Sequence, residues 1–162
     1  MKENFLQRRL VKPILDLLRQ GGTPEKIALS ITLGFVLGVF PVLGSTTALC
    51  ALAALVLRLN LPAIQIINYF VYPLQIALLI PFSRLGERLF RTPHLPLSVP
   101  QIYAMIHANM AEAIHTLWTT TWHAIVVWCL LAPLAAVLVY TALVPALRRA
   151  LHRQTRPAAE HA

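Results

Sequence analysis

The residues best suited to bind a ligand are three hydroxyl side chains, Ser45, Thr46 and Thr47, which follow Pro41 and Gly44 inside a long stretch without charge. If a helix begins at these residues, its free backbone amides and the hydroxyls could bind an anionic group such as a lipid phosphate. The simpler interpretation is that the hydroxyls only cap that helix and accept its first amides. The sequence leaves both interpretations open.

Amide side chains occur in the next charge-free stretch, where Asn68 lies between Gln65 and Gln75. An amide is costly in an apolar medium unless it is hydrogen-bonded. Hydrogen bonds between helices, each worth about 1 kcal/mol or less, would account for these residues. The alternative is a polar lining for a transport path. Pro73 lies between Asn68 and Gln75, and a proline removes a backbone donor from a helix. We therefore expect a second interruption at Asn68 and Tyr72-Pro73.

Arg58 directly follows the first charge-free stretch. Its side chain either extends along apolar surface to reach the membrane interface or binds a lipid phosphate.

We expect no enzyme activity, cofactor or metal. The sequence offers no Ser-His-Asp arrangement, no phosphate-binding loop and no pair of carboxylates in its apolar stretches. His107, His115 and His123 are eight residues apart, which turns each by about 80° around an ideal helix, so they would not share a face. The one Glu-x-x-His pair, Glu112 and His115, falls short of the two pairs that di-iron bundles use.

The composition indicates that these side chains lie in a membrane protein. Charged residues make up 12% of the 162 residues, against roughly 25% in soluble proteins. Lys and Arg number 14 against 6 Asp and Glu. Since the basic residues flank apolar stretches instead of forming one basic face, this excess favours anchoring to lipid and not nucleic-acid binding.

The length of the first charge-free stretch, Ile27 to Leu57, decides how the hydroxyls are positioned. Its 31 residues exceed the roughly 20 that one span needs and fall short of about 40 for two. We expect helices over about 25–39, capped by Thr23 with Pro24 at its start, and about 45–58, meeting at a break inside the membrane. A strongly kinked single span is the alternative.

The remaining segments complete the predicted organisation. Residues 1–22 form an amphipathic helix, which lies in the membrane interface or packs on protein. Residues 23–91 form a membrane core with two broken segments, 92–100 a proline-rich linker, 101–147 a helical pair with the last span, and 148–162 a basic disordered tail. Basic residues at the N-terminus, at 84–91 and at 148–156 should all face the cytoplasm. Residues 101–123 would then cross the membrane and 124–147 return.

One stretch resembles a known family. The residues that carry the resemblance are Gly22-Thr23-Pro24-Glu25-Lys26-Ile27-Ala28, Gly34, Gly38, Phe40-Pro41, Gly44, Arg58-Leu59-Asn60-Leu61-Pro62-Ala63 and Pro73. Together they resemble a bacterial membrane family known as Domain of Unknown Function 2062. The second break of that family looks like an Asn-Pro pair, whereas Tyr72 precedes Pro73 here, which puts any role of that break in doubt. The resemblance implies a bacterial inner-membrane protein, sometimes joined to glycosyltransferase-type domains, and no established activity.

The sequence thus predicts an all-α, multi-pass integral membrane protein with interrupted helices, re-entrant or kinked, and both termini in the cytoplasm. We expect membrane transport or lipid handling, with anionic lipid or a lipid-linked substrate as the partner besides the bilayer. The alternative is a non-catalytic assembly subunit for an envelope enzyme such as a glycosyltransferase; a homo-oligomer is also compatible. The candidate site residues are Pro41, Gly44, Ser45, Thr46, Thr47, Asn68 and Pro73, with Arg58 as a lipid-phosphate contact.

Overall fold

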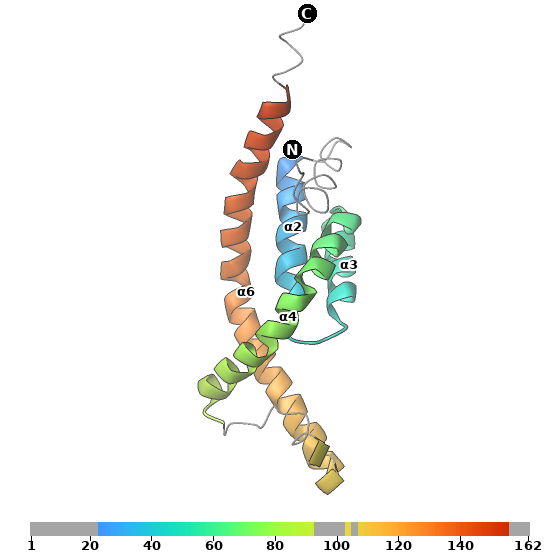
Figure 1. Cartoon of the computed structure of the whole chain (residues 1–162), viewed down its shortest axis with the longest axis vertical. Coiled ribbons are helices and arrows are strands. Elements are labelled where there is room, and N and C mark those ends of the chain that lie inside the picture. Colours follow the sequence, from blue (N-terminus) through green and yellow to red (C-terminus); the bar gives the residue numbers. More distant parts are fainter. Residues whose placement is uncertain (1–22, 93–102, 105–106, 156–162) are drawn as a thin grey trace, which may run out of the picture.

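The computed structural model describes residues 23–92, 103–104 and 107–155, and every regular element in these ranges is helical (Figure 1). The helices are α2 (Pro24–Gly38), α3 (Thr46–Val56), α4 (Leu61–Phe90) and α6 (Met110–Thr155). The all-α prediction is therefore confirmed for this part of the chain. The expected amphipathic helix in 1–22, residues 93–100 of the expected linker and residues 156–162 of the tail lie outside the described residues.

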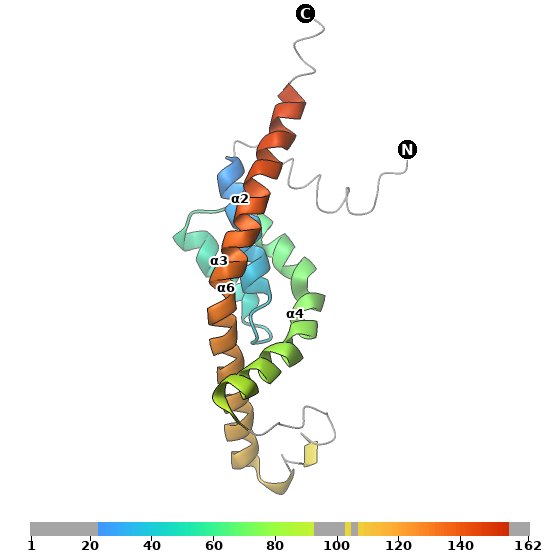
Figure 2. The same cartoon turned by 90° about the vertical axis from the view of Figure 1, so that its left-hand side faces the viewer.

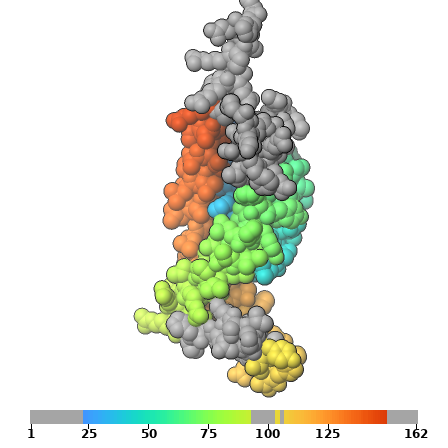
Figure 3. All heavy atoms as spheres, viewed as in Figure 1, coloured from blue at the N-terminus to red at the C-terminus, as the bar shows by residue number. Residues whose placement is uncertain are grey.

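Helix α2 is the centre of the fold and contacts α3, α4 and α6. Little of it is visible between α4 and α6 in the space-filling view (Figure 3). Seven of its 15 residues are buried: Ile27, Ala28, Ser30, Thr32, Gly34, Val36 and Gly38. Most of these are small, and small residues let helix backbones approach each other closely in membrane proteins.

The glycines of α2 set its distance from α4. A Cβ atom on Gly34 would lie 2.7 Å from the carbonyl oxygen of Ile64, and one on Gly38 would lie 3.3 Å from Asn68. Helix α3 packs in the same manner through the small buried residues Cys50 and Ala54. Close packing of backbones thus holds α2, α3 and α4 together.

The expected cap at Thr23 is present, and the structure shows a second cap at Asn60. Thr23 accepts a hydrogen bond from the Lys26 amide (3.3 Å) at the start of α2. Asn60 accepts one from the Ala63 amide (3.0 Å) at the start of α4. The predicted boundaries of 25–39 and 45–58 agree with α2 and α3 to within one or two residues, which is the normal uncertainty of helix ends.

The second interruption, expected at Asn68 and Tyr72-Pro73, is absent. Helix α4 runs without a break for 30 residues, with Pro73 and Pro81 inside it, and it curves along its length (Figure 2). A proline inside a helix costs about 3 kcal/mol. Buried residues on both sides of Pro73, among them Val71 and Phe82, continue to pack on the other helices. This packing offsets the lost hydrogen bond.

The expected pair of helices in 101–147 is also wrong, because α6 is one helix of 46 residues that runs through position 123 without a turn. The prediction of a turn there depended on the charge distribution. The sequence contains no glycine or proline between Met110 and Ala132, so the chain has no residue that would end a helix at this point.

Successive helices run in opposite directions, so their termini gather at two opposite ends of the molecule (Figure 1). The start of α2, the α3–α4 junction and the end of α6 lie at one end, where Arg148 pairs with Glu25 (2.7 Å). The end of α4 lies at the other. Arg58 and Arg91 thus flank α4 on opposite ends, about 45 Å apart along a helix of this length. By length and composition, α4 and α6 could each cross a membrane.

Candidate functional site at the α2–α3 break

The expected break in the first charge-free stretch is present as a turn between α2 and α3. Pro41 is buried, whereas Leu43 and Gly44 are exposed. Gly44 has a φ of 84°, a left-handed conformation that costs other residues about 1–2 kcal/mol. The two helices leave this turn in opposite directions and form a hairpin (Figure 1).

The carbonyl end of α2 is closed by side chains from two other helices. Gln75 of α4 donates to the Phe40 carbonyl (2.8 Å), and the Trp128 indole of α6 donates to the Val36 carbonyl (3.1 Å). The rings of Phe40 and Trp128 also meet edge to face, with centroids 4.9 Å apart. The last carbonyls of a helix have no partner within the helix, and in apolar surroundings each unsatisfied group is costly. Gln75 and Trp128 remove this cost.

The amide end of α3 differs. Within the described residues no side chain caps this helix, because the Ser45 hydroxyl donates to the Val42 carbonyl (2.9 Å) instead. The capping interpretation of the hydroxyls is therefore not supported. First-turn amides have no acceptor within the helix, and they carry the positive end of its dipole. The start of α3 thus has the free donors and the positive dipole end that the anion-binding hypothesis requires.

A small polar cluster lies next to this end of α3. Gln65 of α4 donates to the Thr47 carbonyl (3.0 Å). Asn68 donates to the Gln65 side-chain oxygen (3.2 Å) and makes a long contact of 3.5 Å with the Thr47 hydroxyl. Asn68 is 3% exposed. These bonds confirm that Asn68 and Gln65 connect helices.

The structure brings Pro41, Gly44, Ser45, Thr46, Thr47 and Asn68 together at the turn and beside it, with Thr46 buried and Thr47 exposed. Pro73 does not mark a second break and lies exposed within α4. Arg58 lies at the other end of α3, exposed, with a φ of 51°. It is separate from the turn.

Two residues at the break, Gln75 and Trp128, were not among the predicted site residues. Gln75 was noted only as a hydrogen-bonding amide. Its position in a charge-free stretch was the available signal, since a buried amide needs a partner. Its pairing with Phe40, 35 residues away, follows from how α2 and α4 pack.

A cavity of about 240 Å³ adjoins the turn between α4 and α6. Its lining is Pro41, Leu79, Ile80, Ser83, Leu117, Thr120, Thr121 and Ala124. The hydroxyls of Ser83, Thr120 and Thr121 donate to carbonyls of their own helices at 2.8–2.9 Å. Their oxygens can still accept hydrogen bonds. In the described part of the chain, no group of three His, Cys, Asp or Glu residues could hold a metal ion.

Comparison with known proteins agrees with the resemblance seen in the sequence. No curated protein and no solved structure matches the chain. A family model described as "uncharacterized protein conserved in bacteria (DUF2062)" matches residues 7–156. This range contains the turn, its flanking helices and the whole of α6. The chain therefore belongs to the bacterial DUF2062 family.

Proposed function

We propose that this protein is a non-enzymatic, multi-pass protein of the bacterial inner membrane that handles lipid, with the α2–α3 turn at its working site. One observation carries the proposal: the carbonyl end of the break is closed by Gln75 and Trp128, while the amide end, at Thr46 and Thr47, has no side-chain cap within the described residues. Such an asymmetric break favours the binding of anions.

The helix lengths support a particular placement in the membrane. Helices α4 and α6 would each cross the bilayer. The hairpin helices have 15 and 11 residues, about 22 Å and 16 Å in length, and the hydrocarbon core is about 30 Å thick. The hairpin would therefore enter and leave on the same side, as a re-entrant element. Irregular backbone at membrane depth needs cover from protein, which α4 and α6 supply.

The positive-inside rule then orients the molecule. The residues before α2 and residues 148–156, at the end of α6 and just after it, carry nine of the 14 basic residues and would lie in the cytoplasm. Only three, all within 84–91, would lie outside. The turn of the hairpin lines a cavity together with Ser83 and Ala124. Ser83 is the last residue of the charge-free part of α4, and Ala124 is the first residue of the part of α6 that has neither charge nor histidine. The turn would thus lie in the outer half of the bilayer, on the side of the outer phosphates.

Lipid handling is favoured over transport of a polar solute by the state of the buried polar groups. In the described residues, only Thr32 Oγ1 and Gln75 Oε1 are buried side-chain atoms without a hydrogen-bond partner. A hydrophilic path would need more free polar groups along the bilayer. A lipid needs polar contacts only at its headgroup.

The test is transbilayer movement of lipid in vesicles that contain the full chain. The probe is phosphatidylglycerol with a fluorescent headgroup, bleached from outside by dithionite. We expect faster loss of fluorescence than in protein-free vesicles, and a return towards that baseline when Ser45, Thr46, Thr47 and Asn68 are all changed to alanine. A T119A/T141A variant, which removes hydroxyls elsewhere on α6, is the matched control. No acceleration by the native chain would refute the function, and an unaffected four-alanine variant would refute the site.

A second candidate function, assembly of an envelope enzyme, is favoured by one surface. Large apolar side chains at four-residue spacing lie exposed on the first part of α6: Met110, Ile114, Trp118 and Trp122, each 57–67% exposed. This part extends past the end of α4 (Figure 1). If the protein is a scaffold, M110S/I114S should abolish co-purification with its partner and leave lipid movement unchanged.

A further inference from the structure

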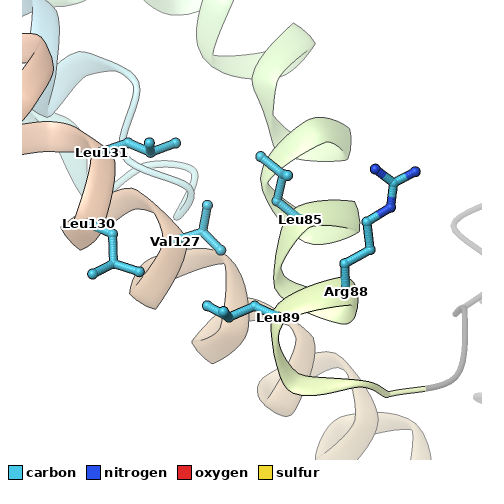
Figure 4. Close-up of a pocket in the computed structure, with 6 residues that line it drawn as sticks. All are labelled: Leu85, Arg88, Leu89, Val127, Leu130 and Leu131. Atoms are coloured by element: carbon cyan, nitrogen blue, oxygen red, sulfur yellow. The ribbon is translucent and has the colours of Figure 1, made fainter.

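A second concave surface lies on α4 and α6, at the end of the molecule where α4 ends (Figure 4). We call it the α4–α6 groove. Its volume is about 380 Å³, and its lining is Leu85, Arg88, Leu89, Val127, Leu130 and Leu131. Figure 4 shows Leu85 and Leu89 facing the three apolar residues of α6. Five of the six lining side chains are thus apolar.

The groove exists because α4 and α6 touch closely just beside it. A Cβ atom on Gly86 would lie 2.8 Å from the Cβ atom of His123, so the two backbones are in contact there. Phe82, Ala124 and Val127 form a buried cluster at the same crossing. Past the crossing the helices are separated, and Leu85, Leu89 and Leu130 remain exposed. In a bilayer, hydrocarbon chains would contact these side chains.

The groove has positive charge on one side only. Residues 84–91 contain three arginines and one glutamate. Arg84 pairs with Glu87 at 3.1 Å, and this carboxylate is buried. Arg88 is exposed, and no ion pair of its guanidinium is found among the described residues. Its aliphatic stem lines the groove, while Figure 4 shows its guanidinium directed away from α6. The apolar walls of the α4–α6 groove thus end beside the positively charged Arg88.

We infer that the α4–α6 groove binds an anionic glycerophospholipid, with one acyl chain along the leucines and the phosphate at Arg88. The inference rests on the proposed lipid-handling function and specifies the class of lipid. The groove lies where the charge-free part of α4 ends and that of α6 begins, the depth at which a lipid changes from acyl chain to headgroup. Its volume suits a small molecule, whereas a helix of a second copy, about 10 Å wide, is too large.

Charge selectivity is tested with the full chain in a mild detergent, by native mass spectrometry during titration with dioleoylphosphatidylglycerol or dioleoylphosphatidylcholine. We expect one tightly held phosphatidylglycerol and weaker phosphatidylcholine. Arg88→Gln should weaken phosphatidylglycerol about five-fold, the effect of one arginine near an anionic headgroup. Arg91→Gln, at the same end but outside the groove, should bind as the native chain does. Equal binding of the two lipids, or equal effects of the two substitutions, would overturn the inference.

The acyl-chain position is tested with two tryptophan variants on α6. Leu130→Trp places a large ring in the groove, and Leu134→Trp places one on the same helix one turn away, at a residue that is similarly exposed. We expect loss of the tightly held lipid in the first variant alone. Both side chains are exposed, so neither change should prevent folding. Equal lipid binding by the two variants would place the lipid elsewhere.

The groove and the proposed function can fail separately. The variant with alanine at Ser45, Thr46, Thr47 and Asn68 should keep the tightly held phosphatidylglycerol, because its changes lie outside the groove. If the native chain binds phosphatidylglycerol as expected but vesicles show no lipid movement, the proposed function is wrong and the groove assignment is retained. If lipid movement is confirmed but Arg88→Gln and Leu130→Trp bind phosphatidylglycerol as the native chain does, the groove assignment is wrong and the proposed function is retained.

Discussion

Two prolines in charge-free segments of this chain differ in their effect: the chain is not helical at Pro41, between α2 and α3, whereas α4 continues through Pro73. Both prolines remove one backbone donor, so proline alone does not explain the difference. Near Pro41, Gly44 takes a left-handed conformation that reverses the chain. Near Pro73 the sequence has no glycine until Gly86.

The second difference is the partners available to the freed carbonyls. Gln75 and Trp128 reach the carbonyls of Phe40 and Val36, so ending α2 leaves few polar groups unsatisfied. Pro73 is exposed on α4, and ending the helix there would separate Val71 from Phe82, both of which are buried. A break therefore forms where the chain can reverse and where other helices supply donors.

The largest expected effect concerns topology, because it is all or none. Since α4 is continuous, reporter fusions after Arg58 and after Arg91 should report opposite sides of the membrane, with Arg58 in the cytoplasm. The interpretation from sequence alone placed residues 84–91, and therefore Arg91, in the cytoplasm as well. Activity fusions with alkaline phosphatase and a fluorescent protein at each position measure this directly. Two cytoplasmic reports would mean that α4 does not cross the bilayer.

The sequence predicted the hairpin better than it predicted α4 or α6, and local signals explain why. Thr23-Pro24, Pro41, Gly44 and Asn60 are caps and turn residues whose effect is nearly independent of the rest of the fold. Whether Pro73 breaks a helix depends on tertiary packing, which local sequence does not encode. The turn expected near residue 123 depended on a charge rule for topology, with no helix-ending residue to support it.

The candidate site was predicted in the same uneven way. The residues of the turn and Asn68 could be identified because hydroxyl and amide groups are rare in charge-free stretches. Trp128 could not, because its donation to Val36 spans 92 residues and tryptophans are also common at membrane interfaces. The α4–α6 groove was equally hidden, because leucines on two distant segments give no signal before they are brought together.

The next largest effect should come from the contact that holds the hairpin on α4. In Gly34→Ala the new methyl group would lie 2.7 Å from the Ile64 carbonyl and 2.9 Å from the Ile67 Cβ atom, so α2 and α4 must separate. We expect a loss of about 3 kcal/mol, the upper end for overpacking, measured as a lower Tm in detergent. Gly38→Ala, whose methyl group would lie 3.3 Å from Asn68, should cost clearly less. Equal Tm values for the two variants would contradict the close packing.

Removing a donor from the break should have an intermediate effect. Gln75→Leu leaves the Phe40 carbonyl without its 2.8 Å hydrogen bond, and a buried unsatisfied group costs about 2 kcal/mol. Gln65→Leu, which loses a bond to the Thr47 carbonyl at a less buried position, is the matched control and should cost less. Thermal unfolding of both variants in one detergent makes the comparison. A Gln75 variant as stable as the native chain would mean that other groups close α2.

Substitutions in the two proline regions should change the Tm in opposite directions, and by less than the substitutions above. Gly44→Ala forces alanine to a φ near 84° and should cost about 1 kcal/mol. Pro73→Ala restores a helix donor within α4 and should raise the Tm or leave it unchanged. If Pro73→Ala destabilises the chain as much as Gly44→Ala does, proline at 73 has a required role and the contrast between the regions is lost.

The smallest expected effect is pH-dependent and lies where α2 meets α6. Arg148 donates to Glu25 at 2.7 and 2.9 Å, and this hydrogen bonding lowers the pKa of Glu25 below its ordinary value of 4.5. A lowered pKa in the folded state means that the pair stabilises the fold above pH 4.5 and that this contribution is lost as the pH falls through the lowered pKa. Glu25→Gln should therefore lower the Tm slightly at neutral pH. The difference from the native chain should shrink as the pH falls below 4.5 and through the lowered pKa of Glu25, because the protonated carboxyl no longer pairs with Arg148 as a charge. A Tm difference that stays constant with pH would show that Glu25 acts through packing and not through its charge.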